Sequence, residues 1–299
     1  MSSPRRVICI GHAALDRIYR IEAFPPRPTK VRAIEHIETG GGMAANAAVA
    51  VSRLGGRAEL WSRVGDDQAG ISIRAGLKAE RVDIRYVDSF AGVRSSTSAI
   101  IVDDNGERLI VGNRDTGMPS GTQWLPLERI KDADAVLGDV RWLEGTRAAF
   151  QEARRHGVPT ILDADLGARE AIPDLLLVTD YAIFSEPALS ELYPGIDVDA
   201  ALNQLLAGGA LHAGVTMGAK GYRYRERGGG GSVPAPTVDV IDTTGAGDAF
   251  HGTFALMLAE GAATADAARA AVHAASRKCT RLGSRAGLPS RAELDAMLA

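Results

Sequence analysis

Cysteines, aromatic side chains and a charge excess of either sign are all scarce in this 299-residue sequence. Its two cysteines, Cys9 and Cys279, both lie in apolar runs, so we expect two buried thiols in a reducing compartment rather than a disulfide. The formal net charge of −3 argues against a general nucleic-acid binder, which usually carries a strong basic excess. Aromatic residues make up 5% of the chain, which leaves few rings to stack on a planar base.

Long apolar runs are absent as well. The run at residues 7–10 stops at Gly11 and His12, which makes it too short for the core of a signal peptide. No stretch approaches the roughly 18 apolar residues of a membrane-spanning helix. We therefore expect a cytoplasmic protein that binds neither a membrane nor a nucleic acid.

Short apolar runs alternate with helical patterns along most of the chain, which is typical of a parallel sheet with crossover helices. The patterns predict strands at 7–11, 58–64, 135–138, 160–163, 181–184 and 214–217, and helices at 43–54, 68–81, 145–156, 198–207, 246–260 and 263–281. The sequence thus predicts one α/β domain over residues 1–299, with a doubly wound, mainly parallel sheet flanked by helices.

Two stretches break this alternation. Residues 18–39 are proline-rich and alternating rather than helical, and residues 95–111 resemble a hairpin, with strands at 97–102 and 108–111 around a turn at 103–106. We expect these segments, about 17–39 and 95–112, to form a small β-sheet that serves as a lid over the site. The glycine-rich segment 227–231 is predicted to be a simple connection.

The most informative stretch is residues 238–250, in which a strand-like run meets a turn of small residues and then an amphipathic helix. Gly245, Ala246 and Gly247 leave the backbone N–H groups uncovered at a helix N-terminus, which suits a phosphate. Asp248 lies in the first helical turn, where the helix dipole should help to keep it ionised. There it can accept the proton of an attacking hydroxyl while the N–H groups stabilise the transferred phosphoryl.

Three other interpretations of this turn were weighed. It could be an ordinary helix start with Asp242 or Thr244 as the cap. It is not a Walker A loop, because no Gly-Lys-Ser/Thr follows. A dinucleotide-binding oxidoreductase would carry its glycine fingerprint after the first strand, and residues 7–11 are not followed by one.

The string Asp-Thr-Thr-Gly-Ala-Gly-Asp-Ala-Phe at 242–250 resembles the C-terminal signature of the ribokinase-like (PfkB) carbohydrate kinases. Gly-Gly-Gly-Met-Ala-Ala-Asn at 40–46 resembles their N-terminal signature, and Arg-Val-Gly-Asp-Asp at 63–67 follows at the familiar distance. The resemblance covers essentially the whole chain. It implies a ribokinase-like fold and transfer of the γ-phosphate of ATP to a sugar hydroxyl.

Carried over position by position, the resemblance implies Asp248 as the catalytic base and Gly245, Ala246 and Gly247 as the anion hole. It places the sugar beside the residues Asp16, Gly41, Gly42 and Asn46. Glycine allows the chain to pass close to a ligand, and asparagine can both donate and accept hydrogen bonds, so the residue types fit these roles. A buried helix cap is the alternative for Asn46.

For ATP, the segment 216–221 resembles the family's Thr-x-Gly-x-x-Gly and implies Thr216, Gly218, Lys220 and Gly221 near the nucleotide. The family's Asn-x-x-Glu motif for Mg²⁺ is replaced here by Ser185 and Glu186 at the start of Ser-Glu-Pro-Ala. Because Mg²⁺ keeps several waters and binds substrate phosphates, this departure need not abolish activity. His273 is expected to border the adenine, and Lys220 as an exposed loop residue is the alternative to its phosphate role.

Two further expectations follow from the resemblance. Asp242, Thr244 and the loop around Gly283 resemble the monovalent-cation site of some members, which could bind K⁺. Exposed apolar lid faces would favour a homodimer through the lid.

Arg141, in Asp-Val-Arg-Trp at the end of a predicted strand, suggests the substrate class. Its planar guanidinium suits a phosphate, sulfonate or carboxylate. Together with segments 184–187 and 278–287, this stretch resembles the sulfofructose kinase branch, which phosphorylates 6-deoxy-6-sulfofructose at C1. Asn113 could also reach the sugar. The alternatives are a structural ion pair for Arg141, a fructose, ribose or ketodeoxygluconate substrate, a nucleoside kinase, and a sugar-sensing pseudokinase.

Overall fold

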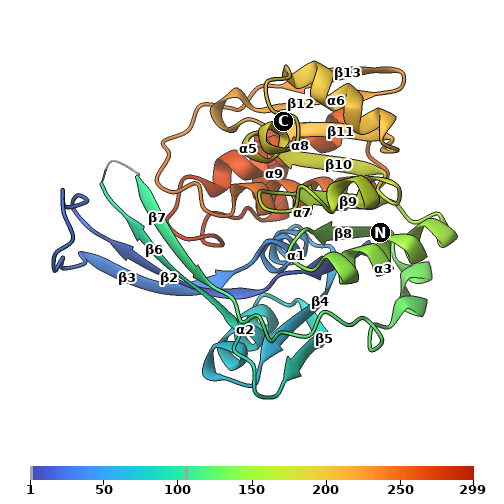
Figure 1. The fold of residues 1–299 in the computed structure, drawn as a ribbon. Coiled ribbons are helices and arrows are strands. Elements are labelled where there is room, and N and C mark those ends of the chain that lie inside the picture. The colour runs from blue at the N-terminus through green and yellow to red at the C-terminus, as the bar shows by residue number, and fades with distance from the viewer. Residues whose placement is uncertain (1–2, 105–106) are drawn as a thin grey trace.

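The computed structural model describes residues 3–104 and 107–299. Its large sheet has the strand order β13-β12-β11-β10-β9-β8-β1-β4-β5 (Figure 1). The strands are β1 (Arg6–Gly11), β4 (Arg57–Gly65), β5 (Asp83–Phe90), β8 (Ala135–Asp139), β9 (Thr160–Ala164), β10 (Tyr181–Ser185), β11 (His212–Thr216), β12 (Tyr222–Glu226) and β13 (Gly229–Val233).

Strands β5, β4, β1, β8, β9, β10 and β11 pair in parallel in this order, and β12 and β13 add an antiparallel edge. Every residue of β8 and β9 is buried, as expected for parallel strands that are covered on both faces. The predicted doubly wound α/β fold is confirmed.

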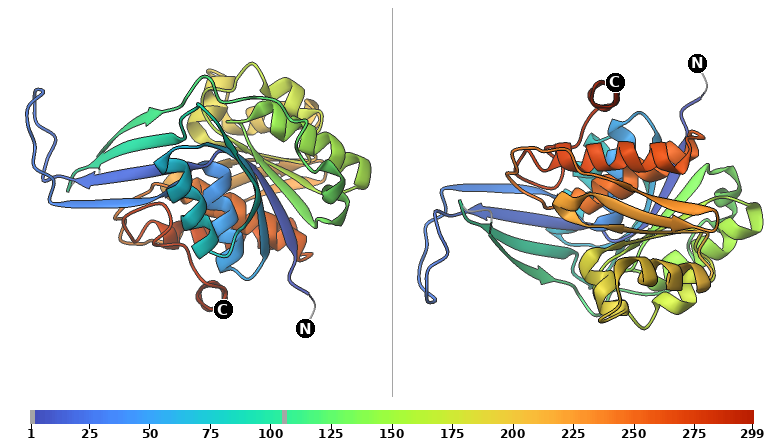
Figure 2. Two further views of the ribbon diagram at one scale, coloured as in Figure 1. Left: turned by 90° about the horizontal axis from the view of Figure 1, so that it is seen from below. Right: turned by 90° about the horizontal axis from the view of Figure 1, so that it is seen from above.

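Two groups of helices cover the large sheet, one on each face (Figure 2). One apolar core packs α1 (Met43–Arg53), α2 (Gln68–Ala79), α7 (Ala246–Ala259), α8 (Thr264–Lys278) and α9 (Arg291–Leu298). The other packs η1 (Leu127–Asp132), α3 (Leu143–His156), α4 (Ile172–Leu176), α5 (Glu186–Leu192) and α6 (Val198–Ala207). A 3-10 turn, η2 (Gly218–Lys220), follows β11.

A second sheet of four strands, called the small sheet below, projects from this body (Figure 1). Its order is β3 (Glu35–Gly41), β2 (Ala14–Arg20), β6 (Ser96–Val102) and β7 (Arg108–Asn113). The predicted hairpin is confirmed by the antiparallel pairing of β6 and β7, although part of its turn, residues 105–106, lies outside the described residues. Ile18, Ile100 and Val102 form its buried core, whereas all of β7 is exposed.

Three local predictions need correction. Strand β5 was missed, because it lies at the sheet edge and its polar, half-buried residues resemble a loop. The glycines of segment 227–231 are not just a connection, since Gly229–Val233 pairs with β12. The helix predicted at 263–281 ends at Lys278, where the chain turns back toward α7.

Both cysteines are buried and unpaired, as expected. In the part of the chain that the structure describes, no helix is long and apolar enough to cross a membrane.

Candidate active site

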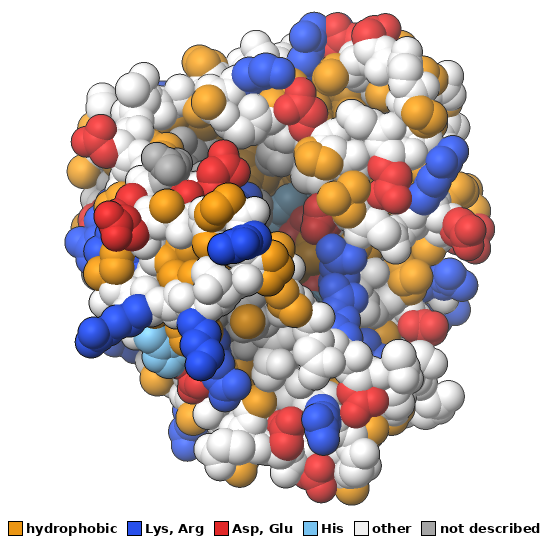
Figure 3. All heavy atoms as spheres, turned by 60° about the vertical axis from the view of Figure 1, so that its left-hand side comes forward, with side chains coloured by type: hydrophobic (Ala, Val, Ile, Leu, Met, Phe, Trp, Pro, Cys, Tyr) orange, Lys and Arg blue, Asp and Glu red, His pale blue; other side chains and the backbone are white. Residues whose placement is uncertain are grey.

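The parallel strands place several polar residues at one edge of the large sheet. Asp139, Asp163, Ser185 and Thr216 stand at or near the carboxyl ends of β8 to β11, and His12 follows β1. Ligands of open α/β sheets bind at this edge. The molecule is hollowed on the side where the small sheet meets the body, and acidic, basic and histidine side chains gather there (Figure 3).

The small-residue turn before α7 has the geometry expected for an anion site. Gly245 adopts φ 78°, and a Cβ at this position would lie 2.9 Å from Ser284. Both the backbone conformation and the lack of space therefore require glycine. A Cβ on Gly247 would meet nothing within 4 Å, so this face of the turn is open. The N–H of Ala246 donates to the carbonyl of Thr243 at 3.2 Å, so of the three predicted N–H groups those of Gly245 and Gly247 remain for a ligand.

Asp248, in that first turn, accepts a hydrogen bond of 2.8 Å from Nδ2 of Asn46. Oδ1 of Asn46 accepts one of 2.8 Å from Nε of Arg285. Because a guanidinium can only donate, this second bond fixes which way the Asn46 amide points. Arg285 thus orients Asn46 so that its NH₂ group faces Asp248, a role for Asn46 beyond the predicted sugar contact.

Burial, and then the nearby charge of Asp163, raises the pKa of Asp248 to about 8, against the lowering effect of the Asn46 hydrogen bond. Burial therefore acts against the helix dipole, which is expected to favour the ionised carboxylate. Desolvation outweighs the dipole because the group lies inside the hollow. In the free protein such a carboxyl accepts a proton only in its ionised fraction, which grows as the pH rises through about 8.

Asp163 was missed by the sequence analysis. Its pKa is raised well above the usual range by burial and then by Asp139 and Asp165. Its Oδ1 lies 3.4 Å from Nδ1 of His251, which is 2.8 Å from the carbonyl oxygen of Gly247. Because that carbonyl can only accept, Nδ1 carries the proton. His251 thus donates a hydrogen bond to the first turn of α7.

Asp139 was noted in the sequence but given no role. Its Oδ2 accepts from the N–H groups of His12 (2.7 Å) and Ala44 (3.0 Å), and its Oδ1 accepts from Arg141 (2.8 Å). Helix α1 begins at Gly42, whose missing side chain cannot cap it. Asp139 therefore caps α1 from another strand and joins three loops of the site.

The double-glycine segment approaches its neighbours as closely as predicted. A Cβ on Gly41 would collide with the carboxylate of Asp16, and one on Gly42, at φ 92°, would lie 2.5 Å from the carbonyl oxygen of His12. The side chain of Asp16 is buried, and burial raises its pKa while Ser98 and Arg285 lower it. The structure thus brings Asp16, Gly41, Gly42 and Asn46 together near Asp248.

The residues predicted for ATP lie at the ends of β10 and β11. Ser185 caps α5 by accepting from the N–H of Ala188 and donates to Asp165. Glu186 pairs with the largely exposed Lys220 at 3.2 Å.

The other residues predicted to bind ATP end a strand, form a turn or lie on a helix. Thr216 pairs with Ser185 in register, and Gly218 and Gly221 adopt φ 54° and 90°. His273, on α8, is half-buried, and its pKa is lowered by burial and then by Arg269.

Arg141 is held by the body of the protein. Its Nη2 lies 2.9 Å from Asp165 and its Nη1 donates to the carbonyl of Leu166 at 2.7 Å. The ion pair considered in the sequence analysis, with Asp139 or Glu144, does not form; only the backbone N–H of Arg141 reaches Asp139. Asn113 ends β7 and is exposed.

The three residues predicted for a monovalent cation also meet. Asp242 accepts from the N–H groups of Thr244 and Gly283, both at 2.8 Å. However, Nζ of Lys278 donates to the backbone carbonyl of Asp242 at 2.7 Å. The residues are therefore a poor fit for K⁺, because a positive charge is already bonded to this carbonyl.

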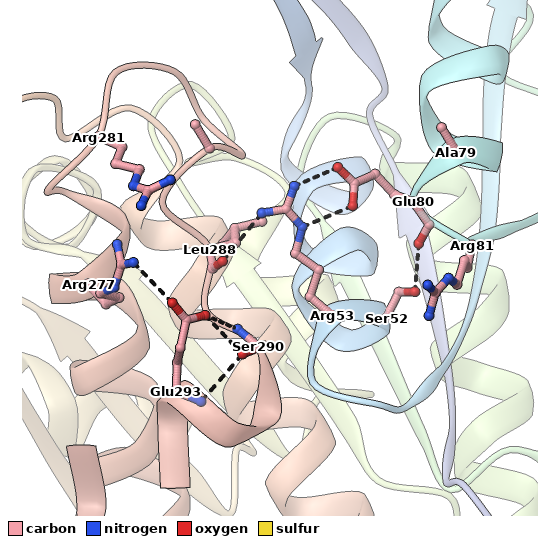
Figure 4. Close-up of a pocket in the computed structure, with 11 residues that line it drawn as sticks. Ser52, Arg53, Ala79, Glu80, Arg81, Arg277, Arg281, Leu288, Ser290 and Glu293 are labelled. Atoms are coloured by element: carbon pink, nitrogen blue, oxygen red, sulfur yellow. Dashed lines mark hydrogen bonds and ion pairs between the residues drawn. The ribbon is translucent and has the colours of Figure 1, made fainter. Parts of the chain in front are cut away.

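A cavity of about 430 Å³ lies away from these residues, between α1, α2 and the C-terminal segment (Figure 4). On its wall Arg53 forms two bonds with Glu80 and donates to the carbonyl of Arg285 at 2.6 Å. These contacts hold the segment that carries Arg285. Nothing in the sequence signalled Arg285, because its hydrogen-bond partners Asn46 and Arg53 are 239 and 232 positions away in the chain.

The chain matches the family described as pfkB family carbohydrate kinase over residues 4–291. It is 30% identical over 300 residues to the ribokinase of Bacillus subtilis, covering 98% of this chain and 99% of the relative. An ATP-dependent ribose-1-phosphate kinase of Halopiger xanaduensis is 28% identical over 261 residues, with 83% of each chain covered. The crystal structure of a candidate ribokinase from Agrobacterium tumefaciens has a TM-score of 0.95 and 38% identity, covering 99% of this chain and 97% of that chain.

The fold and these matches define the protein class as a ribokinase-like α/β kinase. The chain belongs to the pfkB family of carbohydrate kinases. It is an ATP-dependent phosphotransferase with an alcohol group as acceptor.

Replacing Asp163 by Asn should lower the pKa of Asp248, since loss of a nearby negative charge favours the ionised carboxylate. The kcat/KM of the wild-type enzyme should fall as the pH drops below about 8, where Asp248 takes up a proton. In D163N this acid limb should move down by roughly one pH unit. The measurement is kcat/KM against pH, with D295N on the exposed face of α9 as a charge-matched control. Coincident profiles for D163N and wild type would contradict the coupling.

Proposed function

We propose that this kinase phosphorylates a hydroxyl of a ketose-type sugar that carries an anionic group, with the C1 hydroxyl of 6-deoxy-6-sulfofructose as the leading candidate. The observation that carries this proposal is a group of arginines, Arg63, Arg114 and Arg141, around His12 at the same sheet edge as Asp139.

The charges of this group act on one another. Burial, and then Arg114, Arg141 and Arg63, lowers the pKa of His12 to about 3, so the imidazole is neutral. Arg63 stacks on Trp142 at 4.2 Å and donates to the carbonyl of Pro119. The side chain of Arg114 has no hydrogen-bond partner among the described residues, and Nε2 of His12 is buried without one.

Asp165 pairs with Arg141. The charge of Arg63 is favoured by Glu144 and then by Asp139, but neither Arg63 nor Arg114 forms a close ion pair with a described residue. Arg63 is half-buried and Arg114 is exposed, and arginines bind sulfonate, phosphate or carboxylate groups through charge-assisted hydrogen bonds. The exposed Asn113 precedes Arg114 at the end of β7 and lies within reach of the same group on the sugar.

In the proposed reaction, Asp248 accepts the proton of the attacking hydroxyl. The N–H groups at Gly245 and Gly247 stabilise the transferred phosphoryl, and Asp16, Gly41, Gly42 and Asn46 position the sugar. Arg285 keeps the Asn46 amide turned toward Asp248.

ATP would bind across Ser185, Glu186, Thr216, Gly218, Lys220, Gly221 and His273. The described residues contain no cluster of three His, Cys, Asp or Glu side chains that could hold a metal. Mg²⁺ would therefore be held mainly by the phosphates of ATP and by water, with Glu186 as the protein carboxylate proposed to assist. When bound, it would neutralise charge on the phosphates.

We also propose that residues 1–299 form one kinase domain, in which segments 17–39 and 95–112 close as a lid. The face of β7 that carries Leu109 and Val111 is apolar and exposed, with 51% and 57% of each residue accessible, and Ile110 on the other face is 52% accessible. Such a face would be covered in a lid-to-lid homodimer. Sedimentation velocity should therefore detect a dimer that L109E/V111E converts to a monomer. A wild-type protein that sediments as a monomer at every concentration would contradict this.

A neutral pentose is the second candidate, because the Bacillus subtilis relative is a ribokinase. The first experiment is an ADP-release assay with Mg-ATP and sulfofructose, fructose, fructose phosphates, ribose, ketodeoxygluconate and adenosine. We expect kcat/KM to be at least about tenfold higher for an anionic ketose than for a neutral sugar, as one charge-assisted hydrogen bond contributes about 1.5–3 kcal/mol.

In the same assay R114Q should lower kcat/KM for the anionic sugar about tenfold or more and leave neutral sugars unchanged. The exposed R57Q, at the far end of the sheet, is the matched control. A preference for a neutral sugar would return Arg63, Arg114 and Arg141 to a structural role.

Asp248→Asn tests the role of the proposed base. The side chain keeps its shape and can still accept from Asn46, but it can no longer take up a proton at neutral pH. We expect kcat to fall by roughly 10²–10⁴, the usual contribution of a general base. Calorimetric titration should show that ATP and sugar still bind. Undiminished turnover by D248N would refute the assignment.

A further inference from the structure

Lys278 is a fully buried lysine that the proposed reaction does not use. It is the last residue of α8, and its side chain has 0% exposure. Its Nζ donates to the backbone carbonyl of Asp242 at 2.7 Å and lies 3.9 Å from Oδ2 of the same residue. Both groups belong to the loop that leads into Gly245.

A buried ammonium group is costly unless other groups compensate its charge. The helix face around it is built from small apolar residues, Ala267, Ala270, Ala271 and Ala274, so a methionine or leucine would suit this position as a packing residue. Burial lowers the pKa of Lys278; Asp242 and, with a smaller effect, Asp248 favour the ammonium form, while Arg108 opposes it. The lysine therefore lies near the carboxylates of Asp242 and Asp248, and Asp248 is the proposed base.

The loop that Lys278 holds is tied down at several points. The carboxylate of Asp242 accepts from Thr244 and Gly283, and the carbonyl of Cys279 accepts from the N–H groups of Ile241 (2.8 Å) and Asp242 (3.1 Å). Ser284 packs under Gly245 and donates to the carbonyl of Gly40 at 2.6 Å. The ammonium is the cationic centre of this set, and the set fixes the start of α7.

K⁺ is bound in proteins by rings of carbonyl and carboxylate oxygens that replace its hydration shell. The carbonyl and carboxylate of Asp242, with the loop at Gly283, are oxygens and backbone of that kind. The ammonium of lysine is a compact point charge with three donors, so it can direct itself at the same oxygens. A second cation at this carbonyl would be repelled by the first.

We propose that the ammonium of Lys278 is a tethered monovalent cation, which takes the place of K⁺ beside the anion hole and makes the kinase independent of added K⁺. Lys278 is a positioning residue: it orients the carbonyl of Asp242, holds the turn at Gly245, and places a fixed positive charge behind the N–H groups that face the phosphoryl. The proposal rests on the proposed anion hole at Gly245 and Gly247.

The first arm of the test uses the wild-type enzyme and whichever sugar it turns over best. Turnover is measured in tetramethylammonium, Na⁺ and K⁺ salts at constant ionic strength. The expected result is a kcat that changes less than about twofold between them, because the site already holds its cation. Activation of tenfold or more by K⁺ would overturn the proposal. Absence of turnover with every sugar would count against the proposed function instead.

The second arm uses two variants of Lys278. K278A removes the ammonium and leaves a cavity, whereas K278M removes the charge but fills most of the volume. We expect both to lose kcat by tenfold or more with a smaller change in KM, since the loop acts on the transferred phosphoryl. Added K⁺, ammonium or methylammonium should restore kcat in K278A and not in K278M.

The exposed K131A is the matched control and should respond to no cation. Far-ultraviolet circular dichroism and thermal denaturation establish whether each variant is folded, and if K278A does not fold, the wild-type arm and K278M decide the question. A folded K278M with wild-type kcat would show that the ammonium has only a packing role. A K278A variant that loses kcat but is rescued by no cation would likewise overturn the proposal.

Discussion

The carboxylate of Asp139 is the interaction on which the site depends. Its three hydrogen bonds join the end of β1, the start of α1 and the loop after β8, which are 127, 95 and 2 positions away in the chain. One of these bonds satisfies the N–H of Ala44 in the first turn of α1, which Gly42 cannot cap. Because α1 carries Asn46, the position of Asn46 beside Asp248 follows from this capping interaction. The two signature segments, 40–46 and 242–250, meet because Asp139 at the end of β8 holds the first of them.

Burial of charge then sets the chemistry. Burial raises the pKa of Asp139, Asp163 and Asp248; Asp139 adds to the effect on Asp163, and Asp163 and Asp139 add to the effect on Asp248. Backbone N–H groups, Asn46 and the buried Arg285 offset part of this cost. Two cations beyond the substrate region balance this set, with Arg285 behind the proposed sugar position and Lys278 behind the proposed phosphate position. A cluster of carboxylates is thus held between fixed positive charges, which favours a proton acceptor near neutral pH.

Much of the fold was predictable from the sequence, because buried parallel strands and their helices leave strong local patterns. The strands at 135–138 and 160–163 and the helix at 198–207 agree with the structure to within one residue. The edge strand Asp83–Phe90 has no such pattern, since most of its residues are only half-buried. The same contrast holds in the site: glycine-rich turns are visible in the sequence, whereas Arg285 and Lys278 look like ordinary basic residues.

The sequence alone determined the α/β alternation and the turn of small residues before Asp248, with the resemblance that goes with it, because backbone conformation and burial are imposed on residues near one another in the chain. Tertiary structure decided the rest. Only folding brings Asn46 to Asp248, raises the pKa of that carboxyl, gathers Arg63 and Arg114 around His12, and places the ammonium of Lys278 on the carbonyl of Asp242. These effects depend on desolvation and charge between segments far apart in sequence, which no local pattern encodes.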